Sequence, residues 1–270
     1  MKKVSRRKFI YGGLIGFGGL GLTAWFAKNQ ILRRVFQIEK DVPVVPTPAP
    51  LIGDDLCIMT SSTPEGPFYL DAPFRVDVRE KTEGITLDLE LQIIDYPNCI
   101  PVTEALAVIW SCDAHGQYPG YPKEIGHNPW EMAKLVDFGG TPHIEPTNNT
   151  TFLRGSQSPN ENGIVKFKTT FPGWYDPRIP HIHFKIILSD NEEFACELYF
   201  EEDFARDIFT TKAPYNKYGE NPYNFKNDLN MKNIENANGL ILLPEWNADK
   251  TTLKAKAKIG LHKSQFTELV

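Results

Sequence analysis

The sequence predicts an all-β fold: an antiparallel β-sandwich with long site-forming loops and a few short helices, preceded by an N-terminal signal or anchor segment. Residues 85–93 alternate apolar and polar side chains without a break, which is the pattern of a half-buried antiparallel strand. Several further strand-like runs follow, separated by turns and long loops. Aromatic residues make up 12% of the chain and prolines number 21, a composition that favours β structure over long helices.

Length and composition indicate one globular domain with appendages. A chain of 270 residues can bury a sizeable core. A hydrophobic content of 41% and a charged content of 23% are typical of a soluble domain. The net charge of -5 argues against a nucleic-acid partner, because nucleic-acid-binding domains usually present a basic face.

The N-terminus has the pattern of an export signal. A basic head containing Arg6 and Arg7 precedes residues 9–27, which carry no charge and are rich in glycine. The run SRRKFI at residues 5–10 resembles a twin-arginine signal, which implies the twin-arginine export machinery as a partner. Residues 1–28 are therefore expected to be a twin-arginine-like signal or membrane anchor. The alternative is an ordinary membrane anchor in which the paired arginines occur by chance. We expect an exported protein, either periplasmic or held at the outer face of the cytoplasmic membrane by this segment.

A proline-rich spacer separates this segment from the domain. Residues 41–50 are DVPVVPTPAP, a composition that keeps a chain extended. Residues 29–52 are thus expected to be a linker and residues 53–270 the globular domain. The four cysteines permit up to two disulfides in an exported protein, in three alternative pairings. None has the CxxC spacing of a cysteine metal site.

The expected elements of the domain are short strands joined by turns and loops. Such a succession predicts a sandwich whose loops build the site. In chain order they are a loop at 54–69, a strand at 85–93, a turn at 95–98, a strand at 105–110, a polar loop at 111–121, an irregular insertion at 122–150, an ordered section beginning at 151–155, strands at 164–171, 181–188 and 193–200, a short helix at 201–208, a loop at 214–238 and a strand at 252–261.

One stretch carries half of a metal site. Residues 172–184 are PGWYDPRIPHIHF. Residues i and i+2 of a strand point to the same face, so His181 and His183 can aim their imidazoles at one point, while Ile182 and Phe184 enter the core. Pro180 marks the start of this strand, because proline is excluded from the interior of a β-ladder. Two imidazoles on a strand need further ligands from elsewhere in the chain.

Carboxylates and tyrosines are the candidates for those further ligands. Asp176 is the nearest carboxylate in sequence, and the run HIE at residues 143–145 could complete a ferrous site with two histidines and one carboxylate. Tyrosines recur in the loops beside the site, at Tyr118 and Tyr175 among others. A phenol has a pKa of about 10, but a trivalent cation can deprotonate it. Phenolate oxygen is hard and anionic, which suits ferric iron.

Several motifs, in order, carry a resemblance to a known family. They are TPEGPFY at 63–69, VIWSCDAHGQY at 108–118, TFLRGSQ at 151–157, the 172–184 segment and LYF at 198–200. Together they resemble the intradiol ring-cleavage dioxygenases, in particular the exported branch of the catechol- and protocatechuate-dioxygenase-like proteins. The resemblance runs from about residue 57 to about residue 261, so it covers most of the predicted domain and makes residues 53–270 an expected catalytic domain.

The resemblance implies an enzyme, its cofactor and its reaction. Tyr118, Tyr175, His181 and His183 would be the ligands of Fe(3+), with Tyr175 leaving the metal and serving as a base when substrate binds. The substrates would be a catechol-type aromatic diol and O2, and the product a cis,cis-muconate-type dicarboxylate. Arg178 would stabilise negative charge that develops on the substrate ring. Gln157 and Glu197 would lie around the substrate.

Glu197 departs from the family pattern, because relatives usually have glutamine there. The alternation of the strand at 193–200 turns Glu197 away from Phe194, Cys196 and Leu198, and towards the site. A carboxylate beside an anionic catecholate is unfavourable unless it is protonated or paired, for example with Arg178. Glu197 would then change substrate choice or turnover; the alternative is a tolerated replacement without effect.

Two other classes of function remain open on the sequence. One is a non-catalytic exported β-sandwich module that binds an aromatic or glycan ligand. The other is a zinc or copper hydrolase that uses His181 and His183 with Asp176 or Glu197. The particular catechol, cleavage of the signal and the oligomeric state are not indicated by the sequence.

Overall fold

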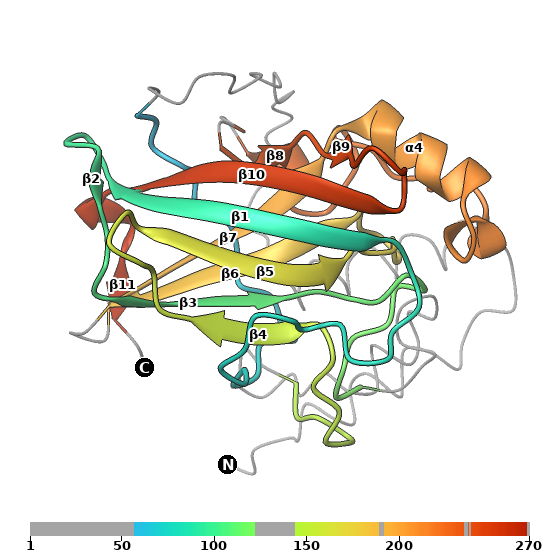
Figure 1. The fold of residues 1–270 in the computed structure, drawn as a ribbon, viewed down its shortest axis with the longest axis horizontal. Coiled ribbons are helices and arrows are strands. Elements are labelled where there is room, and N and C mark those ends of the chain that lie inside the picture. The colour runs from blue at the N-terminus through green and yellow to red at the C-terminus, as the bar shows by residue number, and fades with distance from the viewer. Residues whose placement is uncertain (1–56, 122–143, 189–191, 235–236, 238, 269–270) are drawn as a thin grey trace, which may run out of the picture.

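The structure, a computed structural model, describes residues 57–121, 144–188, 192–234, 237 and 239–268 (Figure 1). The predicted signal segment, the predicted linker and residues 122–143 of the predicted insertion lie outside the described residues. Within the described ranges the strands form two sheets that pack face to face. The predicted β-sandwich is therefore confirmed.

The first sheet is built around the strand with the clearest alternation. β1 pairs with β2 and β5 on one side and with β10 on the other, and β9 follows β10. The strands are β1 (Thr86–Asp95), β2 (Ile100–Pro101), β5 (Ile164–Thr170), β9 (Glu245–Trp246) and β10 (Thr252–Leu261).

The second sheet carries the histidine pair. Its order is β11-β7-β6-β3-β4, and β8 also pairs with β7. The strands are β3 (Ala105–Trp110), β4 (Arg154–Gln157), β6 (His181–Leu188), β7 (Glu192–Phe200), β8 (Ile241–Leu242) and β11 (Thr267–Glu268). The helical elements of the described chain are α4 (Glu202–Thr211) and the 3-10 turns η1 (Tyr215–Tyr218), η2 (Met231–Asn233) and η3 (Lys263–Gln265).

The prediction of antiparallel pairing needs one correction. β1 and β10 pair in parallel along their whole length, from Thr86 opposite Thr252 to Asp95 opposite Leu261, and β7 pairs with β8 in parallel. A tight turn forces two strands to be antiparallel, whereas strands joined by a long connection can run in either direction. Most of the domain lies between β1 and β10, so no turn dictates their direction.

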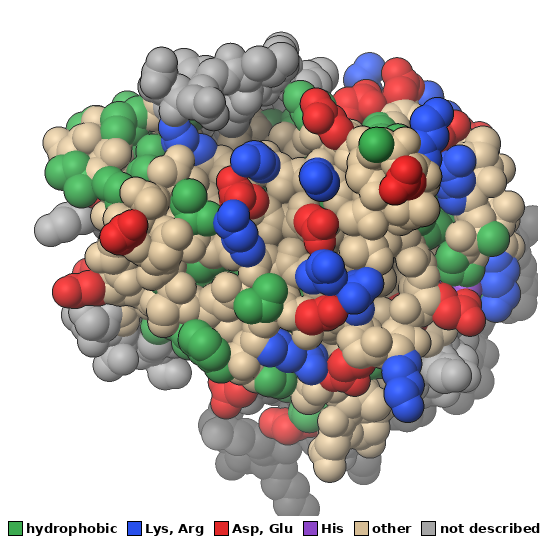
Figure 2. Space-filling model, in the orientation of Figure 1, with side chains coloured by type: hydrophobic (Ala, Val, Ile, Leu, Met, Phe, Trp, Pro, Cys, Tyr) green, Lys and Arg blue, Asp and Glu red, His purple; other side chains and the backbone are tan. Residues whose placement is uncertain are grey.

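The core lies between the sheets. The inward side chains of β1 are Leu87, Leu89, Leu91 and Ile93, each at most 1% exposed. Each such side chain stabilises the fold by about 1.5–3 kcal/mol relative to exposure. The outward face of the same sheet carries charges: Glu90 contacts lysines of both neighbouring strands, and Figure 2 shows Lys, Arg, Asp and Glu side chains intermixed over this face.

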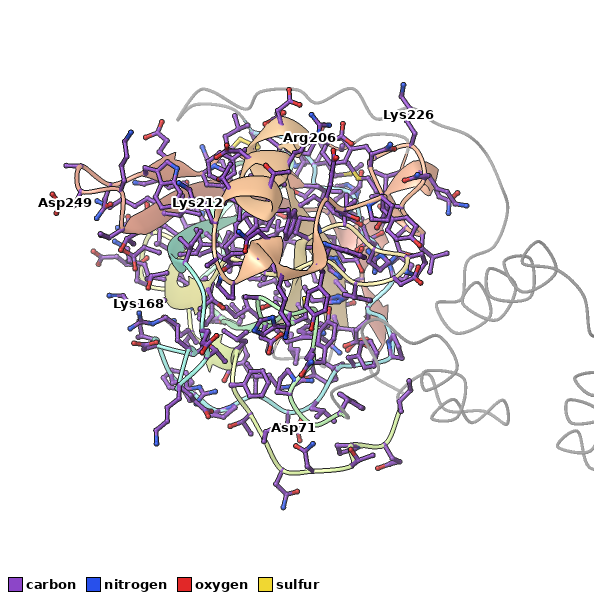
Figure 3. All side chains as sticks on the ribbon, turned by 90° about the vertical axis from the view of Figure 1, so that its right-hand side faces the viewer. Asp71, Lys168, Arg206, Lys212, Lys226 and Asp249 are labelled. Atoms are coloured by element: carbon purple, nitrogen blue, oxygen red, sulfur yellow. A yellow bond between two sulfur atoms is a disulfide. The ribbon has the colours of Figure 1, made fainter. Side chains whose placement is uncertain are left out.

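α4 follows directly after β7, as expected. The Glu201 carboxylate accepts hydrogen bonds from the backbone N–H groups of Asp203 and Phe204, at 3.1 and 2.7 Å, and so caps the helix. The helix packs its buried face, which includes Ile208 and Phe209, onto the sandwich. Figure 3 shows α4 with Arg206 and Lys212, and Asp71 on the loops at the opposite side. No helix in the described ranges is both long and apolar enough to cross a membrane.

The cysteines resolve into one bridge and two buried thiols. Cys57 and Cys99 form a disulfide. Cys112 and Cys196 are free and buried, and burial raises the pKa of both thiols. The alternatives left open by the sequence thus reduce to a single disulfide.

Candidate metal centre

The outer face of the second sheet is covered by loops, and the histidine pair lies beneath them. Cross-strand pairing places Arg154 of β4 beside Trp110 of β3, Trp110 beside His183 of β6, and His183 beside Glu197 of β7. Adjacent residues of neighbouring strands point to the same face, so these side chains form a row across the sheet. Ile182 and Phe184 enter the core on the other face, as the alternation predicts.

Two loops bring the tyrosines over this row. The Asp113 carboxylate accepts hydrogen bonds from the backbone of His115 and Gln117, at 2.8 and 3.0 Å, and shapes the turn that leads to Tyr118. The second loop carries Tyr175. The loops touch at Gly173, where an added Cβ would lie 2.7 Å from the Ala114 carbonyl oxygen. A side chain at this position would push the two tyrosine-bearing loops apart.

Four donor atoms converge beneath the loops. Tyr118 Oη lies 3.0 Å from His183 Nε2, 3.3 Å from His181 Nε2 and 3.5 Å from Tyr175 Oη. The two Nε2 atoms are 3.2 Å apart, and Tyr175 Oη lies 3.4 Å from His181 Nε2. Metal bonds of about 2.1 Å at tetrahedral angles separate ligand atoms by about 3.4 Å. The cluster therefore has the dimensions of one metal ion's ligand shell.

Both imidazoles are neutral, which is the protonation state that binds a metal ion. Burial lowers the pKa of both His181 and His183 well below the ordinary value, so neither carries a proton charge near neutrality. His181 Nδ1 lies 2.7 Å from the Ile179 carbonyl oxygen. A carbonyl only accepts, so Nδ1 donates and Nε2 presents its lone pair to the cluster. Fixing the tautomer in this way is typical of metal-binding histidines.

The phenols need a cation to ionise here. Tyr118 and Tyr175 are 2% and 1% exposed, and burial raises the pKa of each above its ordinary value, further helped at Tyr118 by the neighbouring Tyr175. Without a positive charge between them both phenols stay protonated at neutral pH. A bound trivalent cation reverses this balance, so the donor set fits a hard, highly charged metal ion.

Arg178 lies in a buried cluster of charges beside these atoms. Tyr175 and Arg178 exchange backbone hydrogen bonds across a tight turn, which turns both side chains inward. The guanidinium donates from Nη1 and Nη2 to Glu197 at 3.0 and 2.5 Å, and from Nε to Asp228 at 3.1 Å. Burial opposes its charge, but Asp228 and Glu197 outweigh burial and raise the pKa of Arg178 well above normal.

Glu197 is the central acceptor of that cluster. Burial alone would raise its pKa, but Arg178 outweighs this and the pKa of the carboxyl group is lowered. Asn230 Nδ2 donates to both oxygens at 3.0 and 3.1 Å, and the Tyr199 hydroxyl donates to Oε2. Oε1 also lies 3.6 Å from His183 Nδ1. The pairing with Arg178 expected from the sequence is thus present.

A second set of possible metal ligands shares the two histidines with the tyrosine-histidine set. His181, His183 and Glu197 offer one ligand atom each within 4.8 Å of one another and could hold a metal. The Glu197 oxygens, however, already accept from Arg178, Asn230 and Tyr199. The phenol oxygens lie closer to the Nε2 atoms, at 3.0–3.4 Å, and therefore complete the tighter site.

Other sequence candidates lie apart from the cluster. Gln157 lies at the far end of β4, paired with Ala107, and its side-chain amide donates to the Lys166 backbone. Its role around the substrate stays a prediction. Asp176 accepts a hydrogen bond from the Tyr223 hydroxyl. Glu145 is exposed, and its neighbour in the HIE run at 143 lies outside the described residues.

Sequence reasoning missed four residues of the centre. Trp110 stacks on His183 with ring centroids 4.7 Å apart and planes 1° from parallel. Asp228 and Asn230 come from a loop whose spatial position has no local signal in the sequence. Arg154 is fully buried and donates to the Pro119 carbonyl at 3.0 Å; its Nε and Nη1 have no hydrogen-bond partner in the described chain. Burial lowers the pKa of Arg154 to about 10. The sequence signal for Arg154 was a charged residue within the TFLRGSQ motif, whose second half forms β4.

The fold and the donor set define a β-sandwich with a candidate mononuclear centre of two tyrosines and two histidines. No family model and no curated protein sequence matches the chain. Among solved structures it is similar to an intradiol ring-cleavage dioxygenase from Tetranychus urticae, with a TM-score of 0.65 and 26% identity over 76% of this chain and 95% of that one. A second dioxygenase has a TM-score of 0.65 and 25% identity over 77% and 95%.

These structures confirm the resemblance that the motifs predicted. The chain has the architecture of the intradiol ring-cleavage dioxygenases, which are enzymes. The solved relatives leave the exported branch untested, so that part stays a prediction.

Proposed function

We propose that the protein is a ferric-iron-dependent dioxygenase that cleaves a catechol-type diol between its two hydroxylated carbons. Both atoms of O2 enter the product, so catechol plus O2 balances to a cis,cis-muconate-type dicarboxylate. The observation that carries this proposal is the convergence of two buried phenols and two neutral imidazoles within 3.0–3.5 Å. The similarity to an intradiol dioxygenase supports it.

In this proposal Tyr118, Tyr175, His181 and His183 hold the iron, which when bound supplies a positively charged centre that binds and activates the diol. Tyr175 would accept a proton from a substrate hydroxyl. Arg178, which lies in the same turn as Tyr175, stabilises negative charge on the ring. Its fork is oriented by Glu197 and Asp228 before substrate binds.

Oxygen uptake and colour test this function. Tyrosinate bound to ferric iron absorbs strongly in the visible range, so the iron-loaded protein should be coloured and the colour should change when catechol is added without oxygen. Equimolar O2 consumption and muconate formation should follow on aeration. A colourless protein that retains no iron after reconstitution would refute the proposal.

The same measurements separate the alternatives. A non-catalytic module that binds an aromatic or glycan ligand consumes no O2 with any catechol. A zinc or copper hydrolase retains those metals in elemental analysis and keeps its activity in the Tyr175→Phe variant. Comparing catechol, protocatechuate, hydroxyquinol and alkyl catechols in the oxygen electrode then identifies the preferred substrate.

We propose further that the enzyme works outside the cytoplasm, delivered by the twin-arginine pathway and either released or held at the membrane. The twin-arginine-like N-terminus motivates this, and the Cys57–Cys99 disulfide supports it, because stable disulfides are usual in exported proteins and rare in reducing compartments. Fractionation of cells that express Arg6→Lys with Arg7→Lys tests it: the variant should stay in the cytoplasm.

A further inference from the structure

Strand β6 carries a buried lysine two residues beyond the candidate ligand His183. The proposed chemistry does not use this lysine. Lys185 follows His183 by two residues on β6, so both side chains point to the loop-covered face. Its side chain is 3% exposed. Nζ lies 2.7 Å from Glu65 Oε1 and 2.6 Å from Glu193 Oε2, and 4.2 Å above the Tyr69 ring.

The two carboxylates keep this lysine charged. Burial lowers the pKa of an ammonium group, but the contacts that the Lys185 ammonium makes to the accepting carboxylates of Glu193 and Glu65 outweigh burial, and the pKa of Lys185 is raised. A buried cation with two close carboxylates is a strong positional constraint, because separating it from either one leaves a charge poorly compensated. Both carboxylates are similarly shielded, with 18% and 19% of their side chains exposed.

The two carboxylates differ in how their backbone is held: Glu193 belongs to β7, which the strand ladder fixes, whereas Glu65 belongs to a loop segment that contacts the candidate ligands. Residues 63–69 have no helix or strand of their own and lie against the ligands. Gly66 has φ +81°, and an added Cβ would lie 3.3 Å from His183 Cε1. Phe68 stacks on the Tyr118 ring with centroids 4.5 Å apart. Segment 63–69 therefore forms a wall against one imidazole and one phenol.

Segment 63–69 also contacts His183 indirectly, through the Trp110 ring. The Tyr69 ring meets Trp110 edge-on at 5.2 Å, and Trp110 stacks on the His183 ring at 4.7 Å. The backbone of the segment is tied at its ends, where Thr63 N–H donates to the Ala195 carbonyl and the Pro67 carbonyl accepts from Ile144 N–H, at 3.0 and 2.9 Å. Between these points the Glu65 side chain forms an ion pair with Lys185 of the sheet.

We propose that Lys185 is a positioning residue of the metal centre, which by holding Glu65 fixes segment 63–69 against His183 and Tyr118. The functional part of this inference rests on the proposed iron centre; the mechanical part, that Lys185 orders the segment, does not. Lys185 acts through the segment and does not touch the reacting atoms.

Matched carboxylate variants of the full chain test the proposal. Glu65→Gln and Glu193→Gln each remove one charge at about the same distance from Lys185 Nζ, but only Glu65→Gln loosens segment 63–69. We expect hydrogen exchange of the backbone amides of this segment to rise about tenfold in Glu65→Gln, and iron release to a chelator to accelerate about tenfold, in line with the 10–100-fold effects of groups that orient metal ligands. Glu193→Gln should change either rate by less than about twofold.

Variants at the lysine complete the test. Lys185→Met should reproduce Glu65→Gln in both measurements, and Lys185→Arg, which keeps the charge, should stay close to the parent protein. Equal effects of Glu65→Gln and Glu193→Gln would overturn the proposal, because Lys185 would then only need charge compensation. Exchange is also measured on the metal-free protein, so a chain that binds no iron would refute the proposed function while the exchange result still decides the role of Lys185.

Discussion

Replacing Arg178 by methionine removes the only cation that contacts Glu197 and Asp228 within hydrogen-bonding distance among the described residues. Asp228 remains compensated, because its carboxylate also accepts from the backbone N–H groups of Ile179, Asn230 and Met231 at 2.8–2.9 Å. Glu197 keeps only neutral donors and is fully buried. We therefore expect Glu197 to become protonated in the Arg178→Met variant.

The loss of unfolding free energy in Arg178→Met follows from the proton that Glu197 must take up in the folded state. For a glutamate with an unfolded-state pKa of about 4.3, protonation costs about 3.7 kcal/mol at pH 7 and about 1.6 kcal/mol at pH 5.5. In the parent protein the pKa of Glu197 is lowered, which adds stability above the unfolded-state pKa, whereas a raised pKa in the variant subtracts stability there. The difference in stability between Arg178→Met and the parent should thus shrink as the pH falls.

Urea unfolding of the metal-free proteins at pH 7 and pH 5.5 measures this difference. We expect a loss of about 3–5 kcal/mol at pH 7, and a loss smaller by about 2 kcal/mol at pH 5.5. The double variant Arg178→Met with Glu197→Gln needs no proton and should recover most of the loss at pH 7. An equal loss at both pH values, or no recovery in the double variant, would refute the reasoning and point to lost packing alone.

Three further predictions follow from features described above. Tyr118→Phe and Tyr175→Phe should each weaken the visible absorption of the iron-loaded protein, and the double variant should abolish it, which a spectrum records. Replacing Cys57 and Cys99 by serine opens a loop of 42 residues and should lower the unfolding free energy by about 4 kcal/mol, measured by urea denaturation. Glu90→Gln should cost about 0.5–1 kcal/mol at pH 7 and low salt. Because lysine contacts lower the pKa of Glu90, this contribution should vanish in 1 M salt and as the pH falls below about 4.

Periodic local signals account for the parts that the sequence predicts well. The alternation at 85–93 became β1, and the strand at 193–200 turned Glu197 towards the histidines. Both inferences depend on side chains that alternate between two environments, one of them the core, and this pattern is written in a few consecutive residues. The short helix expected at 201–208 begins one residue later, at Glu202, with Glu201 as its N-cap, and continues to Thr211.

What the sequence could not show depends on distant segments meeting. The direction of β10 relative to β1 is set by packing over a long connection, not by any turn. Asp228 reaches Arg178 from a loop 50 residues away, and Arg154 reaches the Pro119 carbonyl from 35 residues away. Gln157 shows the converse: it belongs to a recognisable motif, but on β4 it pairs with Ala107 and its side-chain amide donates to the Lys166 backbone.

The parallel pair of β1 and β10 constrains the order in which the molecule can be made. β10 is the last long strand among the described residues, and it pairs with β1 over ten residues at the middle of its sheet. During synthesis β1 emerges early and waits with one edge open until β10 has left the ribosome. An open, strongly alternating edge is a site of mispairing, and pairing across such a distance is slow. Chains that terminate before residue 252 should therefore aggregate.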